Sequence, residues 1–266
     1  MYLRRRCAML EPSVVYEAYH ESAPVWRVSI LREYLQLKTL QYIYGTTHGA
    51  GLVFMGGTAV HLFTGSPRFS EDLDFDNRGV SASGFRTLVD DVAHRFALED
   101  VACDVVVKEH RGMTAVLRFT NVLQQWSLTG HRDSVLRIKV DTEPQNFDVA
   151  PERRILSRLD VFVPVLLTPV PVLLAQKFTA LLGRPRTMGR DIYDISWLLG
   201  QVKPDYAYLQ AKAGIPDEGH LRQVVLDKLA TLDIPALRAD VLPFLPSPGE
   251  ADRITLFADL IRTAQL

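Results

Sequence analysis

The stretch Phe54-Met55-Gly56-Gly57-Thr58-Ala59 and the stretch Glu71-Asp72-Leu73-Asp74-Phe75 decide the fold of this chain. The first predicts a short buried strand that runs into a glycine turn and then into a helix with Thr58 as its N-cap. In the second, polar and apolar residues alternate. This alternation predicts a strand with the carboxylates of Asp72 and Asp74 on one face and apolar side chains on the other.

The rest of the chain divides into an α/β lobe with a mixed sheet, residues 1–165, and a helical lobe, residues 166–266. In the first lobe the apolar spacing predicts helices at 26–44 and 85–96 and strands at 101–108, 113–119 and 136–142. After Pro171 the strand signals vanish, and the spacing predicts helices at 171–182, 191–200, 205–213, 218–231, 235–243 and 251–264. The expected fold class is therefore α/β (α+β).

Composition narrows the class of protein. Hydrophobic residues make up 47% of the 266 residues, enough for a sizeable core, and the formal net charge is −1. A nucleic-acid partner would therefore have to meet a local basic patch. Cys7 and Cys103 match neither a disulfide framework nor a zinc site, which fits a reducing cytoplasm. The basic start of the chain lacks the apolar run of a signal peptide, and no stretch is apolar enough to span a membrane, so we expect a cytoplasmic protein.

The paired carboxylates predict a metal site. Asp72 and Asp74 project from the same strand face, and Asp141 on a neighbouring strand completes a trio, although Glu143 has the same strand parity. Carboxylates this close repel each other unless a cation lies between them, and Mg²⁺ prefers such oxygen ligands. Two Mg²⁺ ions would activate an attacking oxygen and neutralise a pyrophosphate leaving group. The alternative is a solvated acidic strand.

The glycine turn favours a phosphate-binding role. Gly56 and Gly57 let phosphate oxygens approach the backbone closely, the following helix N-terminus supplies N–H donors, and the Thr58 hydroxyl adds another. No Gly-Lys-Ser/Thr sequence follows, so this is not a Walker loop. Together with the carboxylates, the turn predicts a site for a nucleoside triphosphate and divalent metal.

Lys177 is unusual because its neighbours on the predicted helix are apolar. One interpretation is an ion pair with Asp191 or Asp194 that joins two helices. The other is that Lys177 binds a triphosphate while Asp191 orients it. The basic loop between them, residues 184–190, would meet the phosphates of an acceptor.

These motifs, in this order, resemble the AbiEii/AbiGii toxin family, including the MenT-like toxins. The residues that carry the resemblance, over about residues 50–200, are Gly56-Gly57-Thr58-Ala59, Arg68-x-Ser70-Glu71-Asp72-Leu73-Asp74-Phe75, Lys177 and Arg190-Asp191-x-x-Asp194. The resemblance implies a polymerase-β-like nucleotidyltransferase core completed by the helical lobe. It also implies that Gly56, Gly57, Thr58, Arg68 and Lys177 bind the nucleotide, that Asp72, Asp74, Lys177 and Asp191 are catalytic, and that the metal ligands include Asp72 and Asp74.

The resemblance further implies a toxin of a toxin–antitoxin system that uses NTP and Mg²⁺. Its acceptor would be the tRNA 3′ end or another RNA, which would block translation, and an AbiEi-like antitoxin would be its partner. Two alternatives stay open: nucleotidyl transfer to a protein or to a small molecule such as an aminoglycoside, and a non-catalytic binding module with a relict site. The turn departs from the Gly-Ser of many nucleotidyltransferases.

Overall fold

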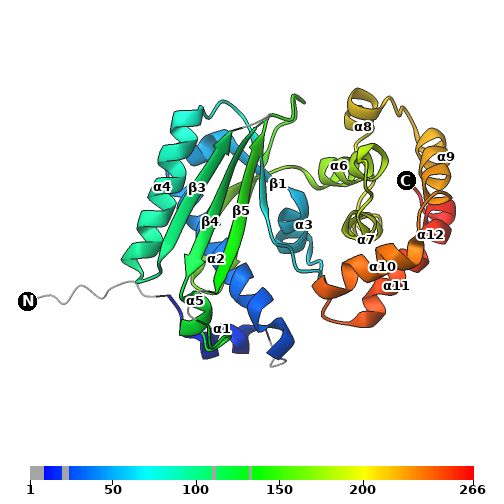
Figure 1. Cartoon of the computed structure of the whole chain (residues 1–266). Helices are drawn as coiled ribbons and strands as arrows, with labels where there is room; N and C mark the ends of the chain where they lie inside the picture. Colours follow the sequence, from blue (N-terminus) through cyan, green and yellow to red (C-terminus); the bar gives the residue numbers. More distant parts are fainter. Residues whose placement is uncertain (1–8, 20–23, 110–111, 132–133) are drawn as a thin grey trace, which may run out of the picture. The chain divides into compact units, whose positions relative to one another are not determined.

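The computed structural model describes residues 9–19, 24–109, 112–131 and 134–266 (Figure 1). The first eight residues, with Cys7 among them, lie outside the described part of the chain, as do His110 and Arg111 between the predicted strands 101–108 and 113–119. The chain forms two compact units. Unit 1 comprises Met1–Met55, Glu71–Gln145 and Pro151–Leu167, and unit 2 comprises Gly56–Ser70, Asn146–Ala150 and Thr168–Leu266.

Unit 1 contains a mixed sheet of seven strands among the described residues, in the order β3-β4-β5-β2-β1-β7-β6. The strands are β1 (Leu52–Met55), β2 (Leu73–Asn77), β3 (Cys103–Glu109), β4 (Met113–Thr120), β5 (Val135–Glu143), β6 (Glu152–Arg158) and β7 (Val161–Leu167). β2 and β5 are parallel, as are β1 and β7, and the other neighbours are antiparallel. The predicted mixed sheet is confirmed.

Two helices of unit 1 pack on this sheet. Helix α2 (Arg27–Tyr44) contacts β5 and β7, and α4 (Ala82–Leu98) contacts β3 and β4 (Figure 1). Alternate residues of β5, such as Ile138 and Val140, are fully buried, whereas Arg137 and Lys139 between them are exposed. The sheet therefore buries one face of β5 in the core and turns a polar face outward. Shorter helices complete the unit: α1 (Pro12–Ala18), α5 (Val122–Gln125), η1 (Pro24–Trp26) and η2 (His48–Gly51).

Unit 2 is helical. Its elements are α3 (Gly56–Thr64), α6 (Val170–Gly183), α7 (Gly189–Leu198), α8 (Tyr206–Ala213), α9 (Glu218–Leu229), α10 (Ile234–Val241), η3 (Leu242–Phe244), η4 (Pro248–Ala251), α11 (Asp252–Thr255) and α12 (Phe257–Thr263). Helix α7 contacts α3, α6, α10 and α11, and is the centre of this packing. The predicted helices between residues 171 and 243 are confirmed, whereas the helix predicted at 251–264 is divided at Leu256 into α11 and α12. None of the described helices is long and apolar enough to cross a membrane.

Three details differ from the sequence-based expectation. Thr58 is not an N-cap, because α3 already begins at Gly56. Gly56 has a φ of 80°, which glycine adopts without steric cost. Thr58 is buried in the first turn of the helix. Strand β2 begins at Leu73 rather than at Glu71, because β1 ends at Met55, which pairs with Asp74. The hairpin of β6 and β7 was not predicted.

Candidate functional site

Three carboxylates lie on neighbouring strands of unit 1. Asp74 on β2 is in register with Asp141 on the parallel strand β5, and Asp72 immediately precedes β2. Between the two aspartates of this segment, Leu73 is fully buried, as is Phe75 after them. This alternation brings Asp72, Asp74 and Asp141, which we call the acidic face, to the outward side of the sheet. Glu143 is in register with Asp76, and each of these residues lies two positions after Asp141 and Asp74 on its own strand.

Lys139 and Thr114 hold Asp141 in place. The Lys139 ammonium forms an ion pair with Asp141, and Thr114 on β4 donates a hydrogen bond of 2.6 Å from Oγ1 to Asp141 Oδ1. Burial alone would lower the pKa of Lys139, but its hydrogen bond to Asp141 and the negative charges of Asp141, Asp72 and Asp74 raise it above the usual value for lysine. The three carboxylates thus create a field that favours a cation.

The donor set of the acidic face fits a hard divalent cation, because it offers only carboxylate oxygens and an electrostatic field that stabilises positive charge. Within the part of the chain that the structure describes, no three His, Cys, Asp or Glu side chains are already arranged as ligands of one ion. Lys139 contacts Asp141 instead. A metal ion that used Asp141 would therefore have to displace or share this ammonium.

The glycine turn belongs to unit 2. A Cβ atom on Gly57 would lie 2.8 Å from Arg68 Nη2 and 3.0 Å from Ser70 Oγ, so the guanidinium packs directly against the glycine backbone. Arg68 is only 1% exposed and cannot easily move away. Glycine is therefore required at position 57 by close packing within the protein, in addition to any ligand that approaches the turn.

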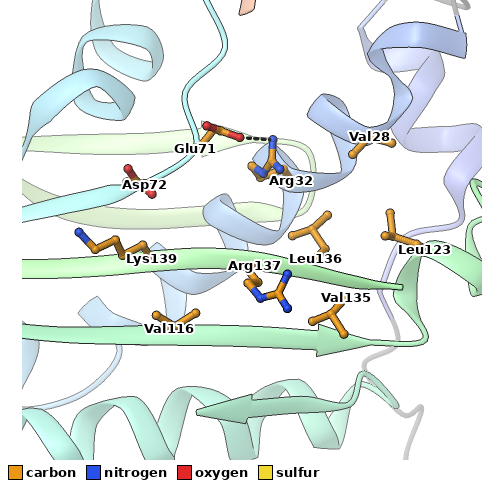
Figure 2. A pocket seen from close by; sticks show the side chains of 10 residues that line it. All are labelled: Val28, Arg32, Glu71, Asp72, Val116, Leu123, Val135, Leu136, Arg137 and Lys139. Atoms are coloured by element: carbon orange, nitrogen blue, oxygen red, sulfur yellow. Dashed lines mark ion pairs between the residues drawn. The ribbon is translucent and has the colours of Figure 1, made fainter. Parts of the chain in front are cut away.

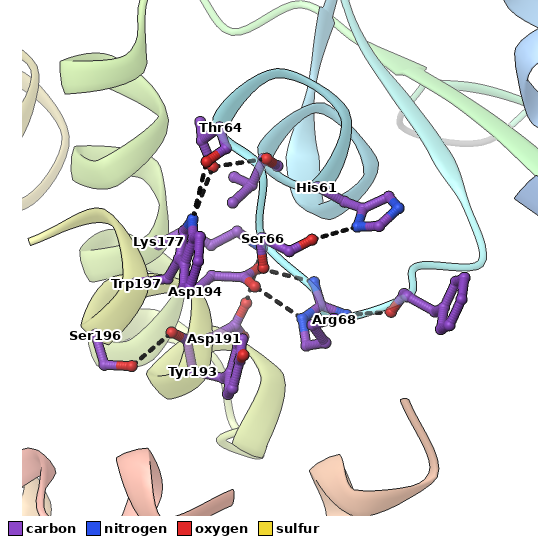
Figure 3. Close-up of polar contacts among 12 residues, drawn as sticks. His61, Thr64, Ser66, Arg68, Lys177, Asp191, Tyr193, Asp194, Ser196 and Trp197 are labelled. Atoms are coloured by element: carbon purple, nitrogen blue, oxygen red, sulfur yellow. Dashed lines mark hydrogen bonds and ion pairs between the residues drawn. The ribbon is translucent and has the colours of Figure 1, made fainter. Parts of the chain in front are cut away.

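Five charged side chains of unit 2 form an ion network. Four of them are largely buried, namely Arg68, Lys177, Asp191 and Asp194 (Figure 3), and the fifth, Arg184, is 47% exposed. Arg68 donates two hydrogen bonds to the Asp194 carboxylate, at 2.8 and 2.9 Å. Lys177 Nζ lies 2.8 Å from Asp194 Oδ2 and 3.3 Å from Asp191 Oδ1. Arg184 reaches the other oxygen of Asp191 at 2.7 Å. Three cations thus share two carboxylates, which leaves one positive charge in excess.

Burial and charge act in opposite directions in this network. Burial alone would raise the pKa of Asp194, but the charges of Arg68 and Lys177 lower it below the usual range. Burial alone would lower the pKa of Lys177, but the carboxylates of Asp194 and Asp191 raise it. Asp194 and Lys177 are therefore both held in their charged forms, and the charge of each depends on its partners.

Neighbouring contacts fix the elements that carry the network. Trp197 Nε1 on α7 donates to Thr64 Oγ1 at the end of α3, at 3.1 Å, and Arg68 Nη1 donates to the carbonyl oxygen of Phe69 at 2.8 Å. His61 Nδ1 lies 2.5 Å from the carbonyl oxygen of Ser66 (Figure 3). The bond from Trp197 joins α7 to the end of α3, and the other two contacts fix the segment after α3, so the glycine turn and the ion network lie together in unit 2.

The predicted site residues therefore fall into two groups. Asp72, Asp74 and Asp141 lie together on the acidic face of unit 1, whereas Arg68, Lys177 and Asp191 lie in the ion network of unit 2. Gly57 packs against this network, and Gly56 and Thr58 flank it in sequence.

The sequence reasoning missed two contacts. It did not identify Lys139 as the partner of Asp141, although both residues lie on the same strand face, and it did not pair Arg68 with Asp194. The spacing of polar residues on β5 was a usable signal for the first pair. No sequence signal links residues 68 and 194, which are joined only by tertiary packing.

The chain is similar to a known protein family and to solved structures. The family model "Nucleotidyl transferase AbiEii toxin, Type IV TA system" matches residues 41–256. Two solved structures from Helicobacter pylori are similar. JHP933 is 18% identical with a TM-score of 0.54, covering 88% of this chain and 91% of its own. A candidate nucleotidyltransferase is 19% identical with the same TM-score, covering 88% of this chain and 94% of its own. A search of the curated proteins found no match.

At these identities the two structures support the fold, which is that of nucleotidyltransferase-like proteins. The family match is broader, because it spans most of the chain and includes the glycine turn, the acidic face and the ion network. The chain belongs to the AbiEii nucleotidyltransferase toxin family of type IV toxin–antitoxin systems.

Proposed function

We propose that this protein is a Mg²⁺-dependent enzyme that transfers nucleotides from an NTP to an RNA acceptor, the tRNA 3′ end, and thereby blocks translation. The family membership supports nucleotidyl transfer and an antitoxin partner. The observation that carries the metal-dependent chemistry is the acidic face, where Asp74 and Asp141 are in register on adjacent parallel strands and Asp72 precedes the same strand.

In this proposal Asp72, Asp74 and Asp141 hold the metal. When bound, Mg²⁺ supplies charge neutralisation for the phosphates and lowers the pKa of an attacking oxygen. Thr114 fixes one oxygen of Asp141 through its 2.6 Å hydrogen bond, which leaves the carboxylate oriented before any ligand binds. Lys139 serves as the counter-ion of the acidic face in the free protein.

The donor phosphates are assigned to unit 2. The backbone of Gly56 and Gly57 faces the triphosphate, and Lys177 binds it as a point charge, which the excess positive charge of the ion network supports. Thr58 was also expected to bind the nucleotide, but its side chain is fully buried in the first turn of α3, which favours a packing role. Asp191 orients Lys177. Arg68 was expected to bind the nucleotide, but its burial and its two hydrogen bonds to Asp194 favour a positioning role, in which it keeps Asp194 against Lys177.

The proposal is tested by incubating the purified protein with Mg²⁺, total tRNA and each NTP labelled at its α-phosphate. Wild-type protein should label the tRNA. Asp74→Asn should reduce the rate roughly 100- to 1,000-fold, as expected when one group that stabilises the transition state is removed. The matched control is Asp227→Asn, an exposed carboxylate on α9 that hydrogen-bonds only Gln223 among the described side chains.

Two results would contradict this proposal. Label that appears only in protein, such as the antitoxin, would replace the RNA acceptor with a protein acceptor. Identical behaviour of wild type and Asp74→Asn in every transfer and growth assay would remove the catalytic role altogether.

A further inference from the structure

A pocket of about 520 Å³ opens beside the acidic face, entirely within unit 1 (Figure 2). Its size is within the range of sites that enclose a small ligand or one unit of a polymer. Asp72 and Lys139 form one side, and Val28, Val116, Leu123 and Val135 supply apolar surface. Arg32 and Arg137 complete the charged lining. The pocket therefore combines cations with apolar contacts next to a candidate metal ligand.

The cations of this pocket differ in their partners. Arg32 forms an ion pair with Glu71 at 3.1 Å, and Lys139 pairs with Asp141. Arg137 points into the same space, yet no ion pair joins it to any other described residue (Figure 2). The buried Arg32 Nε also lacks a hydrogen-bond partner within the described residues. The pocket thus keeps one whole guanidinium, that of Arg137, for a ligand.

The sheet register adds a second indication of an anion. Arg137 on β5 lies directly opposite Arg118 on β4, and like charges in this position repel each other. Among the described residues neither arginine has a carboxylate within ion-pair distance. Asp104 on β3 lies opposite Arg118 on its other side, so a negative charge stands opposite Arg118 but not opposite Arg137. A bound anion beside Arg137 would reduce the repulsion between the two arginines.

We propose that this pocket binds the terminal part of the nucleic-acid acceptor, with Arg137 on a backbone phosphate and the apolar side chains against the base or ribose. The proposal rests on the proposed nucleotidyl transfer, because a hydroxyl at the strand end would then be presented to Asp72. A strand-end phosphate suits a single unpaired guanidinium. A serine or tyrosine acceptor of a protein would need no such cation.

The pocket fits the acceptor better than the donor. A triphosphate is usually held by several backbone N–H groups, whereas β5 pairs with β4 on one side and with β2 on the other. The pocket therefore supplies side-chain donors without a cradle of backbone donors. We therefore assign to Arg137 one backbone phosphate of the nucleic-acid acceptor, and not a phosphate of the NTP.

The test measures binding separately from transfer. Fluorescein-labelled total tRNA is titrated with protein in EDTA and without NTP, and fluorescence anisotropy is followed from low to moderate salt. Arg137→Gln should weaken tRNA binding about 5- to 10-fold at low salt and reduce the slope of log K against log salt by about 1. Arg137→Lys should retain the salt slope. Binding of each labelled NTP with Mg²⁺ should stay unchanged in both variants.

Arg153→Gln is the matched control. Arg153 is an exposed arginine on β6, separated from β5 by three other strands of the sheet. The pocket assignment would be overturned if wild type and Arg137→Gln bound tRNA equally, or if Arg153→Gln lost as much affinity as Arg137→Gln. It would also be overturned if Arg137→Gln lost NTP binding and not tRNA binding, or if the wild type did not bind tRNA. If tRNA binding depends on Arg137 but no label is ever transferred to RNA, the proposed reaction fails while the pocket assignment stands.

Discussion

Lys139 and Lys177 both form ion pairs with aspartates, but the two lysines differ in their exposure to solvent. The side chain of Lys139 is 47% exposed and its partner Asp141 is 27% exposed, whereas Lys177 is 11% exposed and its partners Asp191 and Asp194 are at most 1% exposed. An exposed ion pair contributes little to stability and is easily exchanged for another ligand. A buried pair is costly to break, since the remaining charge has no water to solvate it. The acidic face is therefore suited to exchange cations, and the ion network is suited to hold a fixed geometry.

The largest expected effect separates the two regions by stability. Asp194→Ala leaves the buried cations Arg68 and Lys177 with one carboxylate fewer, and should lower the free energy of unfolding by about 3–5 kcal/mol. Urea denaturation followed by circular dichroism measures this loss. Asp259→Ala is the control, because this exposed carboxylate on α12 pairs with Arg262 alone within the described part of the chain and should cost at most about 1 kcal/mol. Equal losses in the two variants would mean that the ion network does not support unit 2.

A second comparison distinguishes the two candidates for the third metal carboxylate. Asp141→Asn should reduce the transfer rate roughly 100-fold, in line with the loss of one transition-state contact, and leave the urea midpoint nearly unchanged. Glu143→Gln should have little effect on either quantity, since Glu143 is in register with Asp76 and not with Asp74. Single-turnover transfer of labelled nucleotide measures the rates. A greater loss in Glu143→Gln would reverse the assignment.

The smallest expected effect concerns pH. The pKa of Asp194 is lowered from its usual value of 3.8, so its ion pairs stabilise the fold fully above about pH 4. This contribution is lost as the pH falls through the lowered pKa of the folded state. Lys177 has a raised pKa, so its contribution is present below pH 10.5 and is lost as the pH rises through the folded value.

Thermal unfolding between pH 7 and pH 3 tests the acid side of this behaviour. Wild type should lose stability more steeply below pH 4 than Asp194→Asn, whose side chain does not ionise. Parallel curves for the two proteins would show that Asp194 does not carry the acid sensitivity.

Local patterns predicted much of the fold correctly. The alternation of Ile138 and Val140 with charged residues on β5, and the apolar spacing of α6 and α7, follow directly from strand and helix geometry. The start of β2 could not be predicted, because it depends on where β1 runs out of partners, and β1 ends at Met55. Helix α3 begins before Thr58 for a similar reason, since Gly56 adopts a positive φ that the sequence permits without requiring.

The candidate site was predictable to a different extent in each unit. Asp72 and Asp74 are close in sequence, so strand geometry alone places them on one face. The apolar neighbours of Lys177 singled it out together with Asp191, and the family resemblance then matched both residues. Their contact at 3.3 Å agrees with the ion-pair interpretation, one of the two that the sequence left open. The bidentate pair of Arg68 with Asp194 depends on long-range packing, which no local pattern encodes. The ionic partner of Asp141 was within reach of strand spacing, because Lys139 lies two residues earlier on the same face of β5.

The parallel pairing of β2 with β5 has a consequence for the order of folding. Asp74 and Asp141 are adjacent in space but 67 positions apart in the sequence, and contacts of such separation form slowly because a long loop must close first. The antiparallel hairpin of β4 with β5 involves neighbouring segments and needs no such closure. We therefore expect the three carboxylates to meet late, after β5 has been synthesised and paired with β4. A nascent chain that ends before residue 141 would lack a complete acidic face, so under the proposed function the transfer activity would arise only once the sheet is assembled.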